Sequence, residues 1–343
     1  FRQENIDNLI NAEIIIGNKN KSKITKYIKE YAKTHKRIIE FYDMASVDFE
    51  DMEIKKYEHH HRAFIKIEDG CNNFCSYCII PYVRGRVRSK EFNKCIIEAQ
   101  DLAISGHKEI VLSGIHTGQY NDEGKKLSDL INELSKIEEL KRIRLSSVEI
   151  VELDEKMMDI IKNNNKFVSH LHIPLQAGSD HILKLMNRRY DKEYFKNKVN
   201  EIRSLRKDIS LSTDVIVGFP GETDEDFNET MEFCKEIGFS KIHVFPYSDR
   251  NGTVASKMKD HIERSIIKER ARKLIALSNE LEKEYFNKFI DKEEDVLIEE
   301  YKGGYFHGFT SNYIPVKLNG NYEINSLIPI KLTNENINFE LNS

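Results

Sequence analysis

Three cysteines lie within eight residues of one another and carry the strongest chemical signal in the chain. Cys71, Cys75 and Cys78 have the spacing C-x3-C-x2-C, directly after the apolar run Ala63–Ile67. Thiolates are the protein ligands of iron–sulfur clusters, and a four-iron cluster normally takes four of them. Three thiolates leave one iron without a protein ligand. The spacing therefore predicts a [4Fe–4S] cluster whose open iron chelates S-adenosylmethionine (SAM) and supplies the electron that cleaves it.

A zinc site is the alternative for these cysteines. Zinc prefers four ligands, usually in paired C-x2-C units, and a second pair is missing here. Cys95 and Cys234 stand alone within helical patterns and are expected to be small core residues. The histidines at 59–61 precede the strand and are assigned no role. Five cysteines, three of them clustered, do not resemble a secreted disulfide framework and favour metal ligation in a reducing compartment.

Composition limits the class of protein further. The 343 residues are 39% hydrophobic, which is enough for a folded core. With 53 basic and 57 acidic residues the net charge is −4, which argues against indiscriminate nucleic-acid binding but not against a local basic groove. No apolar run approaches the ~20 residues of a membrane helix, and no signal peptide is visible. We expect a cytoplasmic protein that does not bind a membrane.

Strand and helix patterns alternate through the centre of the chain. Six β/α repeats predict an α/β fold with a parallel sheet, and full barrel closure would need eight strands. We therefore expect an incomplete (β/α)6 barrel whose open side admits a large substrate. The predicted strands are Ala63–Ile67, Glu109–Ser113, Arg142–Ser146, His170–Ile173, Ser210–Val217 and Lys241–Phe245. The predicted helices are Phe92–Ile104, Leu127–Glu138, Asp154–Asn163, Lys192–Leu205 and Glu225–Glu236.

The two ends of the chain do not follow this alternation of strands and helices. A strand at Ala12–Asn18 and a helix at Lys21–Lys33 resemble the last unit of a small α/β domain, followed by a linker over Phe41–His61. Because the chain begins at Phe1, we expect that an N-terminal portion is missing. A long helix over Ile262–Phe289 precedes a small all-β module. Its predicted strands are Asp295–Glu300, Tyr305–Thr310, Ile314–Leu318, Ser326–Leu332 and Ile337–Leu341.

The cysteine run, with Tyr77 before its last member, resembles the signature of the radical SAM superfamily. The following segment, Ile79–Ser89, is similar to the methylthiotransferases, which attach a methylthio group to tRNA or to a ribosomal protein. The segment Leu112–Tyr120 resembles the branch that acts on N6-threonylcarbamoyladenosine next to the tRNA anticodon. The branches that modify isopentenyladenosine or a ribosomal-protein aspartate differ there and remain alternatives. Further matching segments are Leu145–Glu149, His172–Ser179, Met186–Tyr190, Thr213–Glu222, Phe245–Ser248 and Arg250–Ala255.

The resemblance implies a two-step reaction. One SAM donates a methyl group to sulfur on an auxiliary cluster, and a second yields the 5′-deoxyadenosyl radical that abstracts hydrogen from C2 of the adenosine. The family holds this second, auxiliary [4Fe–4S] cluster with three N-terminal cysteines that this chain lacks, so it is expected in the full-length protein only. Implied partners are the tRNA anticodon stem-loop, a reductant such as flavodoxin or ferredoxin, and a sulfur source.

The resemblance also divides the chain into three parts. Residues 1–50 would be the remnant of the N-terminal methylthiotransferase domain with a linker, and 51–280 the radical SAM partial barrel. Residues 281–343 look like a TRAM domain, a small RNA-binding barrel. An alternative of a different class is an RNA-binding protein in which the cluster is structural.

Residues at predicted strand ends are expected to surround the cofactor, with ordinary turns and helix caps as the alternative. This expected SAM site consists of Tyr77, Ser113, Gly114, Ser147, Glu149, Gln176, Asp214, Gly218 and Phe245. Asp214 lies inside a strand and, if buried, should be paired with a group such as an arginine. Five arginines near the open face are expected to contact tRNA phosphates, with ion pairing or solvated surface as the alternative. They are Arg84, Arg86, Arg88, Arg188 and Arg189. No catalytic residue beyond the cluster ligands is assigned.

Overall fold

The computed structural model describes residues 11–40, 47–52 and 62–339. The three histidines at 59–61 and most of the predicted linker 41–61 lie outside the described residues.

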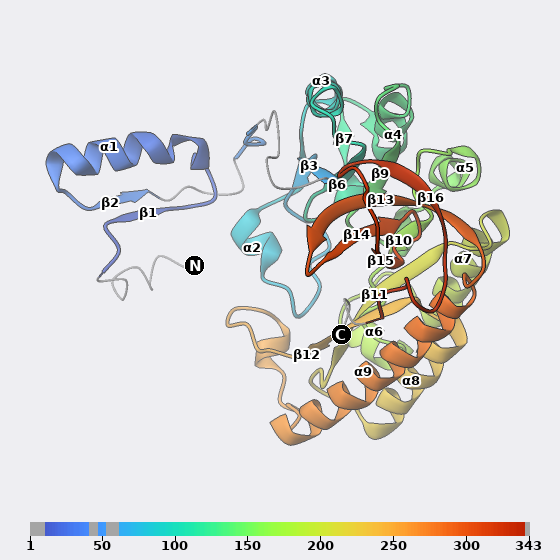
Figure 1. Ribbon diagram of the computed structural model, residues 1–343. Coiled ribbons are helices and arrows are strands. Elements are labelled where there is room, and N and C mark those ends of the chain that lie inside the picture. The colour runs from blue at the N-terminus through green and yellow to red at the C-terminus, as the bar shows by residue number, and fades with distance from the viewer. Residues whose placement is uncertain (1–10, 41–46, 53–61, 340–343) are drawn as a thin grey trace.

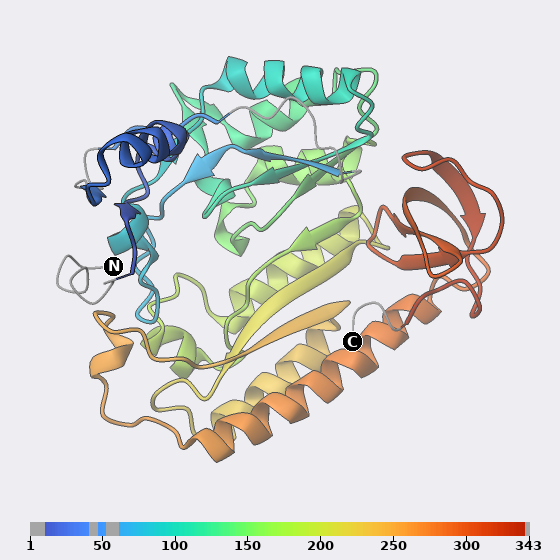
Figure 2. The same cartoon turned by 60° about the vertical axis from the view of Figure 1, so that its left-hand side comes forward.

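Six parallel strands form the centre of the described chain (Figures 1 and 2). They make two three-stranded sheets in the orders β3-β6-β9 and β10-β11-β12, and a bridge between Ile143 and Phe167 connects the two. All six predicted strands are confirmed, with each end within one residue of its predicted position. The strands are β3 (Arg62–Lys66), β6 (Glu109–Ser113), β9 (Arg142–Leu145), β10 (His170–His172), β11 (Ser210–Val217) and β12 (Lys241–Pro246).

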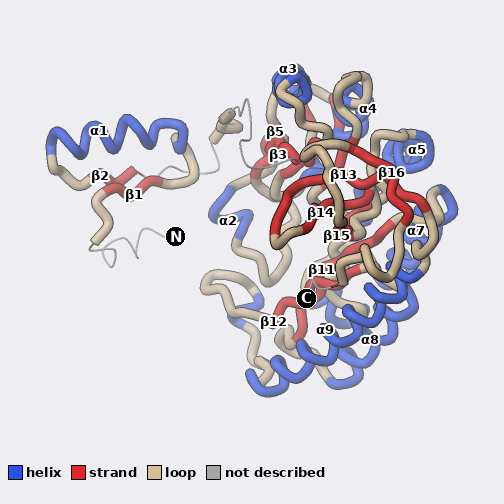
Figure 3. Tube along the Cα trace, in the orientation of Figure 1, coloured by secondary structure: helices blue, strands red, loops and turns tan. Residues whose placement is uncertain are grey.

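Helices cover the outer face of these strands, as Figures 2 and 3 show. Two of them begin with a side-chain cap: Asp154 accepts from the Met157 N–H and Thr223 from the Asp226 N–H, which satisfies otherwise unpaired donors. The helices are α3 (Phe92–Ile104), α4 (Leu127–Leu134), α5 (Glu155–Asn163), α7 (Lys192–Leu205), α8 (Asp224–Ile237) and α9 (Arg264–Asn287). The prediction for α4 was four residues too long. The short helices α2 (Ile80–Arg84) and α6 (Asp180–Leu185) were not predicted.

The N-terminal unit is a small β-α-β element. Strands β1 (Ile14–Ile16) and β2 (Ile38–Glu40) pair in parallel on either side of α1 (Ile24–Thr34), and β2 was not predicted. Figure 1 shows this unit beside α2 and away from the helical outer layer. The Asn18 Nδ2 donates to the Val83 carbonyl at 3.1 Å, which connects the unit to α2.

The C-terminal module is a four-stranded antiparallel sheet in the order β15-β14-β13-β16. It has its own hydrophobic core, which begins with Tyr285 and Phe286 on the last turn of α9. The predicted strand Ile337–Leu341 is wrong, because Ile337 makes one isolated bridge to Val316 and Leu341 lies outside the described residues. The strands are β13 (Glu293–Lys302), β14 (Tyr305–Thr310), β15 (Pro315–Leu318) and β16 (Leu327–Lys331).

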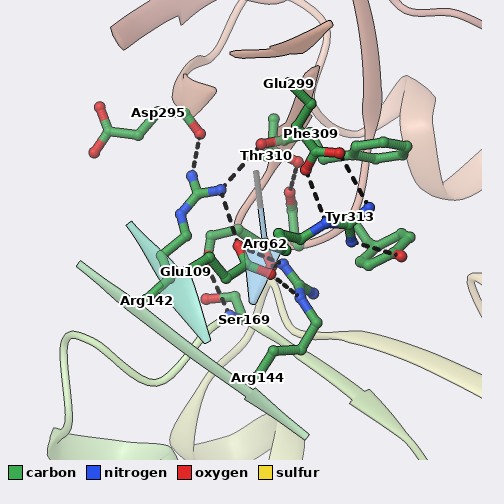
Figure 4. Close-up of polar contacts among 12 residues, drawn as sticks. Arg62, Glu109, Arg142, Arg144, Ser169, Asp295, Glu299, Phe309, Thr310 and Tyr313 are labelled. Atoms are coloured by element: carbon green, nitrogen blue, oxygen red, sulfur yellow. Dashed lines mark hydrogen bonds and ion pairs between the residues drawn. The ribbon is translucent and has the colours of Figure 1, made fainter. Parts of the chain in front are cut away.

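A buried charge network holds this module against the first residues of the parallel strands (Figure 4). Glu109 is fully buried at the start of β6, with the Arg144 Nε 2.6 Å and the Arg142 Nη1 3.6 Å from its carboxylate. Arg142 donates to the Phe309 and Asp295 carbonyls of the module.

Arg62 makes a second group of contacts between the strands and the module. Its guanidinium pairs with Glu299 at 2.8 Å and donates to the Tyr313 hydroxyl at 2.8 Å. All these partners meet at the amino-terminal ends of the strands. The carboxyl-terminal ends, where the sites of such α/β folds are built, are left clear of the module.

His170 makes the stability of this end of the sheet sensitive to acid. Burial lowers the pKa of His170 well below 6.5, and the charge of Arg144 lowers it further. The unfolded chain therefore takes up a proton below pH 6.5 that the folded chain does not. Stability that is complete above pH 6.5 should fall by about 1.4 kcal/mol at pH 5.5.

We expect His170→Gln to remove this loss. The measurement is the free energy of urea unfolding for the wild type and the variant at pH 7.5 and 5.5. The difference in free energy of unfolding between the wild type and the variant should change with pH. A constant difference at both pH values would contradict the prediction.

Candidate cluster and cofactor site

The three predicted cluster ligands lie on one loop after β3 and the short strand β4 (Glu68–Asp69). All three are partly exposed and carry no disulfide. Burial raises the pKa of the Cys78 thiol to about 11, and the charges of Cys75 and Cys71 contribute to the rise. Three thiolates in this loop therefore require compensating positive charge, which bound iron would supply.

The end of the short helix α6 and the residues that follow it hold the cysteine loop in place. The Ser76 N–H donates to the Met186 carbonyl at 3.1 Å, and the Ser76 hydroxyl donates to the Leu185 carbonyl at 2.8 Å. The Asn187 Nδ2 donates to the Phe74 carbonyl at 3.2 Å. The segment Met186–Tyr190 thus positions the cluster ligands.

Arg188 belongs to this inner structure, which corrects its predicted role as a phosphate contact. Its side chain is 3% exposed, its Nη1 lies 3.3 Å from the Cys75 Sγ, and its Nη2 pairs with Glu149. Glu149, predicted to bind the cofactor, is therefore engaged by Arg188. An arginine held this way is not available to RNA.

His116 makes the equivalent contact on the other side of the loop. Its Nδ1 lies 3.4 Å from the Cys71 Sγ, and its Nε2 forms an ion pair with Glu152 at 2.6 Å. Burial lowers the pKa of His116, but the hydrogen bonds to Cys71 and Glu152 outweigh it and raise the pKa to about 10. Sequence reasoning missed His116, although it lies in the segment Leu112–Tyr120 directly after a strand, a position that favours site residues.

Two glycines of the same segment make room for the carboxylates around His116. A Cβ at Gly118 would lie 1.9 Å from the Glu152 Oε2, and one at Gly114 would lie 2.8 Å from the Glu68 Oε2. Glu68 accepts the His116 backbone N–H at 2.6 Å, and burial raises the pKa of Glu68 to about 7. The glycines therefore allow two carboxylates to fix the histidine.

The donor set fits a cluster better than a single ion. Among the described residues, no three His, Cys, Asp or Glu side chains gather around one metal position. Three thiolates spread along one loop match a [4Fe–4S] cluster, in which each holds a different iron.

Comparison with known proteins decides the family. The radical SAM superfamily model matches residues 65–234. The threonylcarbamoyladenosine tRNA methylthiotransferase of Bacillus subtilis is 38% identical over 93% of this chain and 73% of its own length. The enzyme of the same name from Aquifex aeolicus is 39% identical over 93% of this chain and 77% of its own length. The ribosomal protein uS12 methylthiotransferase of Clostridium botulinum is 36% identical over 98% of this chain and 78% of its own length. The chain belongs to the radical SAM methylthiotransferases. Membership implies a [4Fe–4S] cluster and SAM.

Most residues predicted to bind SAM in this methylthiotransferase lie at carboxyl-terminal strand ends. Tyr77 lies in the cysteine loop and packs edge-on against Phe219, with ring centroids 6.5 Å apart, and Phe219 packs in the same way against Tyr247. Phe245 is half exposed near the end of β12. Five further members follow or end neighbouring strands: Ser113 and Gly114 at β6, Ser147 after β9, Gln176 after β10 and Gly218 after β11.

Asp214 of the methylthiotransferase has a histidine as its partner. The prediction offered an arginine as one example of a partner for a buried Asp214; the side chain is 27% exposed and pairs with His172 on the neighbouring strand at 3.2 Å. His172 also lines a cavity of about 430 Å³ that the strands enclose together with Arg144, His170 and Tyr313. No cysteine lines this cavity, so it is separate from the cluster ligands.

The predicted phosphate contacts divide into paired and exposed arginines. The Arg88 Nη2 lies 3.0 Å from Asp69, and its Nη1 donates to the Arg84 carbonyl, so Arg88 is a structural residue of the loop. Arg84 lies 3.7 Å from the same carboxylate. Arg86 is exposed and its guanidinium lies 4.6 Å from the centre of the Phe74 ring. Arg189 is exposed as well.

Cys95 and Cys234 are fully buried, as predicted. In the part of the chain that the structure describes, no helix is long and apolar enough to cross a membrane.

Proposed function

We propose that this protein adds a methylthio group to C2 of N6-threonylcarbamoyladenosine next to the anticodon of tRNA. The observation that carries the proposal is the loop of Cys71, Cys75 and Cys78, with donors on two of its sulfur atoms. The substrate follows from the two relatives named for threonylcarbamoyladenosine and from the segment Leu112–Tyr120. Relatives named for dimethylallyladenosine in tRNA and for protein uS12 define the alternatives.

The fold proposed for this activity is an incomplete (β/α)6 barrel over residues 51–280. The strand order from β3 to β12 supports it. Residues 281–343 would be a TRAM-like RNA-binding domain, and the separate core that begins at Tyr285 supports a distinct unit. Residues 1–50 would belong to a separate N-terminal unit, and the β-α-β element of β1, α1 and β2 supports this division. The five free cysteines support a cytoplasmic location.

Each part of the site would have one task. Cys71, Cys75 and Cys78 would hold three irons, and the cluster with SAM supplies one-electron cleavage that produces a hydrogen-abstracting radical. Tyr77 and its ring neighbours Phe219 and Tyr247 would exclude water from the reacting groups. The backbone and side chains at the ends of β6, β9, β10 and β11 would orient SAM. A reductant such as flavodoxin or ferredoxin and a sulfur source would complete the reaction.

Nucleoside mass spectrometry tests the substrate. In a strain from which the gene is deleted, we expect loss of the methylthio form of threonylcarbamoyladenosine while the dimethylallyladenosine derivative persists. Loss of the latter, or of the methylthio group on protein uS12, would assign the protein to another branch. If all three modifications persist, the alternative of an RNA-binding protein with a structural cluster would be favoured.

Arg86 and Arg189 should provide phosphate contacts, because both are exposed. We expect the double substitution of these residues by glutamine to weaken binding of an anticodon stem-loop and to reduce the slope of log K against log salt by about 1 to 2. Fluorescence anisotropy at several salt concentrations measures this. Lys136→Gln, on an exposed lysine paired with Glu133, is the matched control. An unchanged slope for the double variant would place the RNA elsewhere.

A further inference from the structure

Two buried pairs of a cation and a carboxylate lie directly behind the cysteine loop. His116 faces Cys71 and is held by Glu152, and Arg188 faces Cys75 and is held by Glu149. The side chains of both cations are at most 5% exposed. Their burial reduces the solvent screening that weakens interactions between charges on the surface.

The geometry makes each cation a hydrogen-bond donor to sulfur. Arginine has N–H donors and no acceptor, so the 3.3 Å contact between Arg188 Nη1 and Cys75 Sγ runs from nitrogen to sulfur. His116 lies between a carboxylate at Nε2 and a thiol at Nδ1, so both ring nitrogens face acceptors when Cys71 is a thiolate. His116 therefore donates from Nδ1 to the Cys71 thiolate, while its Nε2 is ion-paired with Glu152.

The surroundings hold each donor in a fixed direction. The Arg188 Nε donates to the Tyr190 hydroxyl at 3.1 Å, and that hydroxyl donates in turn to the Pro174 and Leu175 carbonyls. The backbone of His116 is held by Glu68, and Gly118 leaves the space that Glu152 occupies. Neither cation can turn away from its cysteine without breaking a buried ion pair.

We propose that His116 and Arg188 are positioning residues that raise the reduction potential of the cluster through donation to the Sγ atoms of Cys71 and Cys75. Hydrogen bonds and positive charge next to cluster sulfurs stabilise the reduced, more negative form. The two pairs thereby set how readily the cluster accepts the electron it passes to SAM. This proposal rests on the cluster that the proposed function requires.

The test is a midpoint potential of the reconstituted protein, measured by EPR-monitored titration without SAM. We expect His116→Gln and Arg188→Gln each to shift the reduction equilibrium about tenfold toward the oxidised form, which is about 59 mV for one electron. Arg188→Lys keeps the charge and should stay close to the wild type. His181→Gln is the matched control, because His181 also pairs with a carboxylate, Asp226 at 3.0 Å on α8.

Iron content and absorbance near 400 nm separate this proposal from the proposed function. A wild-type protein that assembles no cluster would count against the function itself. Variants that hold the wild-type amount of iron and keep the wild-type potential would overturn the positioning role. If His116→Gln does not assemble a cluster, the comparison of Arg188→Gln with Arg188→Lys decides the proposal at Cys75 instead.

Discussion

Replacement of Cys75 by alanine should abolish methylthio transfer and remove the brown chromophore of the reconstituted protein. Cys75 provides one of three thiolates for three irons, and a cluster held by the remaining two has a second open iron. Arg188 would then be left as a buried cation facing an empty position. We expect the methylthio nucleoside to fall at least about a thousandfold, below detection, when the variant complements a deletion strain, because no alternative source supplies the radical.

Cys234→Ala is the matched control for this experiment. Cys234 is fully buried on α8 and contributes a thiol to the core. The substitution should cost about 1 kcal/mol of stability through a small cavity and leave absorbance near 400 nm and the modification unchanged. Full modification of tRNA by Cys75→Ala would reject the enzymatic role of the cluster.

Replacement of Glu109 by glutamine should produce the largest loss of stability. The carboxylate is fully buried between Arg144 and Arg142, and its charge also acts on Arg62. Burial alone would raise the pKa of Glu109, but the guanidiniums of Arg144 and Arg142 hold it below its usual value. Removal of one partner from a buried ion pair typically costs 3–5 kcal/mol, because it leaves uncompensated charge, and we expect about that loss.

Urea unfolding of Glu109→Gln and hydrogen exchange of β13 and β14 measure this effect. Arg142 also donates to the Asp295 and Phe309 carbonyls, so the substitution should accelerate the exchange of amides in the module more than that of amides in α3. Glu133→Gln removes an exposed partner of Lys136 and should change stability by less than about 1 kcal/mol. A loss of the same small size for Glu109→Gln would show that the network does not hold the module.

The chemistry predicted for the chain and the order of its strands and helices follow from local features of the sequence. The spacing of Cys71, Cys75 and Cys78 is local, and a loop of eight residues can present all three to one cluster wherever the rest of the chain lies. The apolar runs and helical periods are local as well, so every central strand was predicted to within one residue.

Only the packed fold shows which charged residues lie against the cysteine loop, which are exposed and which hold the module. Arg188 and Arg189 are neighbours with the same side chain, yet one is buried against Cys75 and the other is exposed. His116 and Glu109 acquired their partners in the same way, from segments tens of residues distant. The physical reason is that burial and ion pairing are properties of contacts between distant segments. A local pattern specifies which groups a chain carries, and only the packed fold specifies which of them lose their water and against what charge.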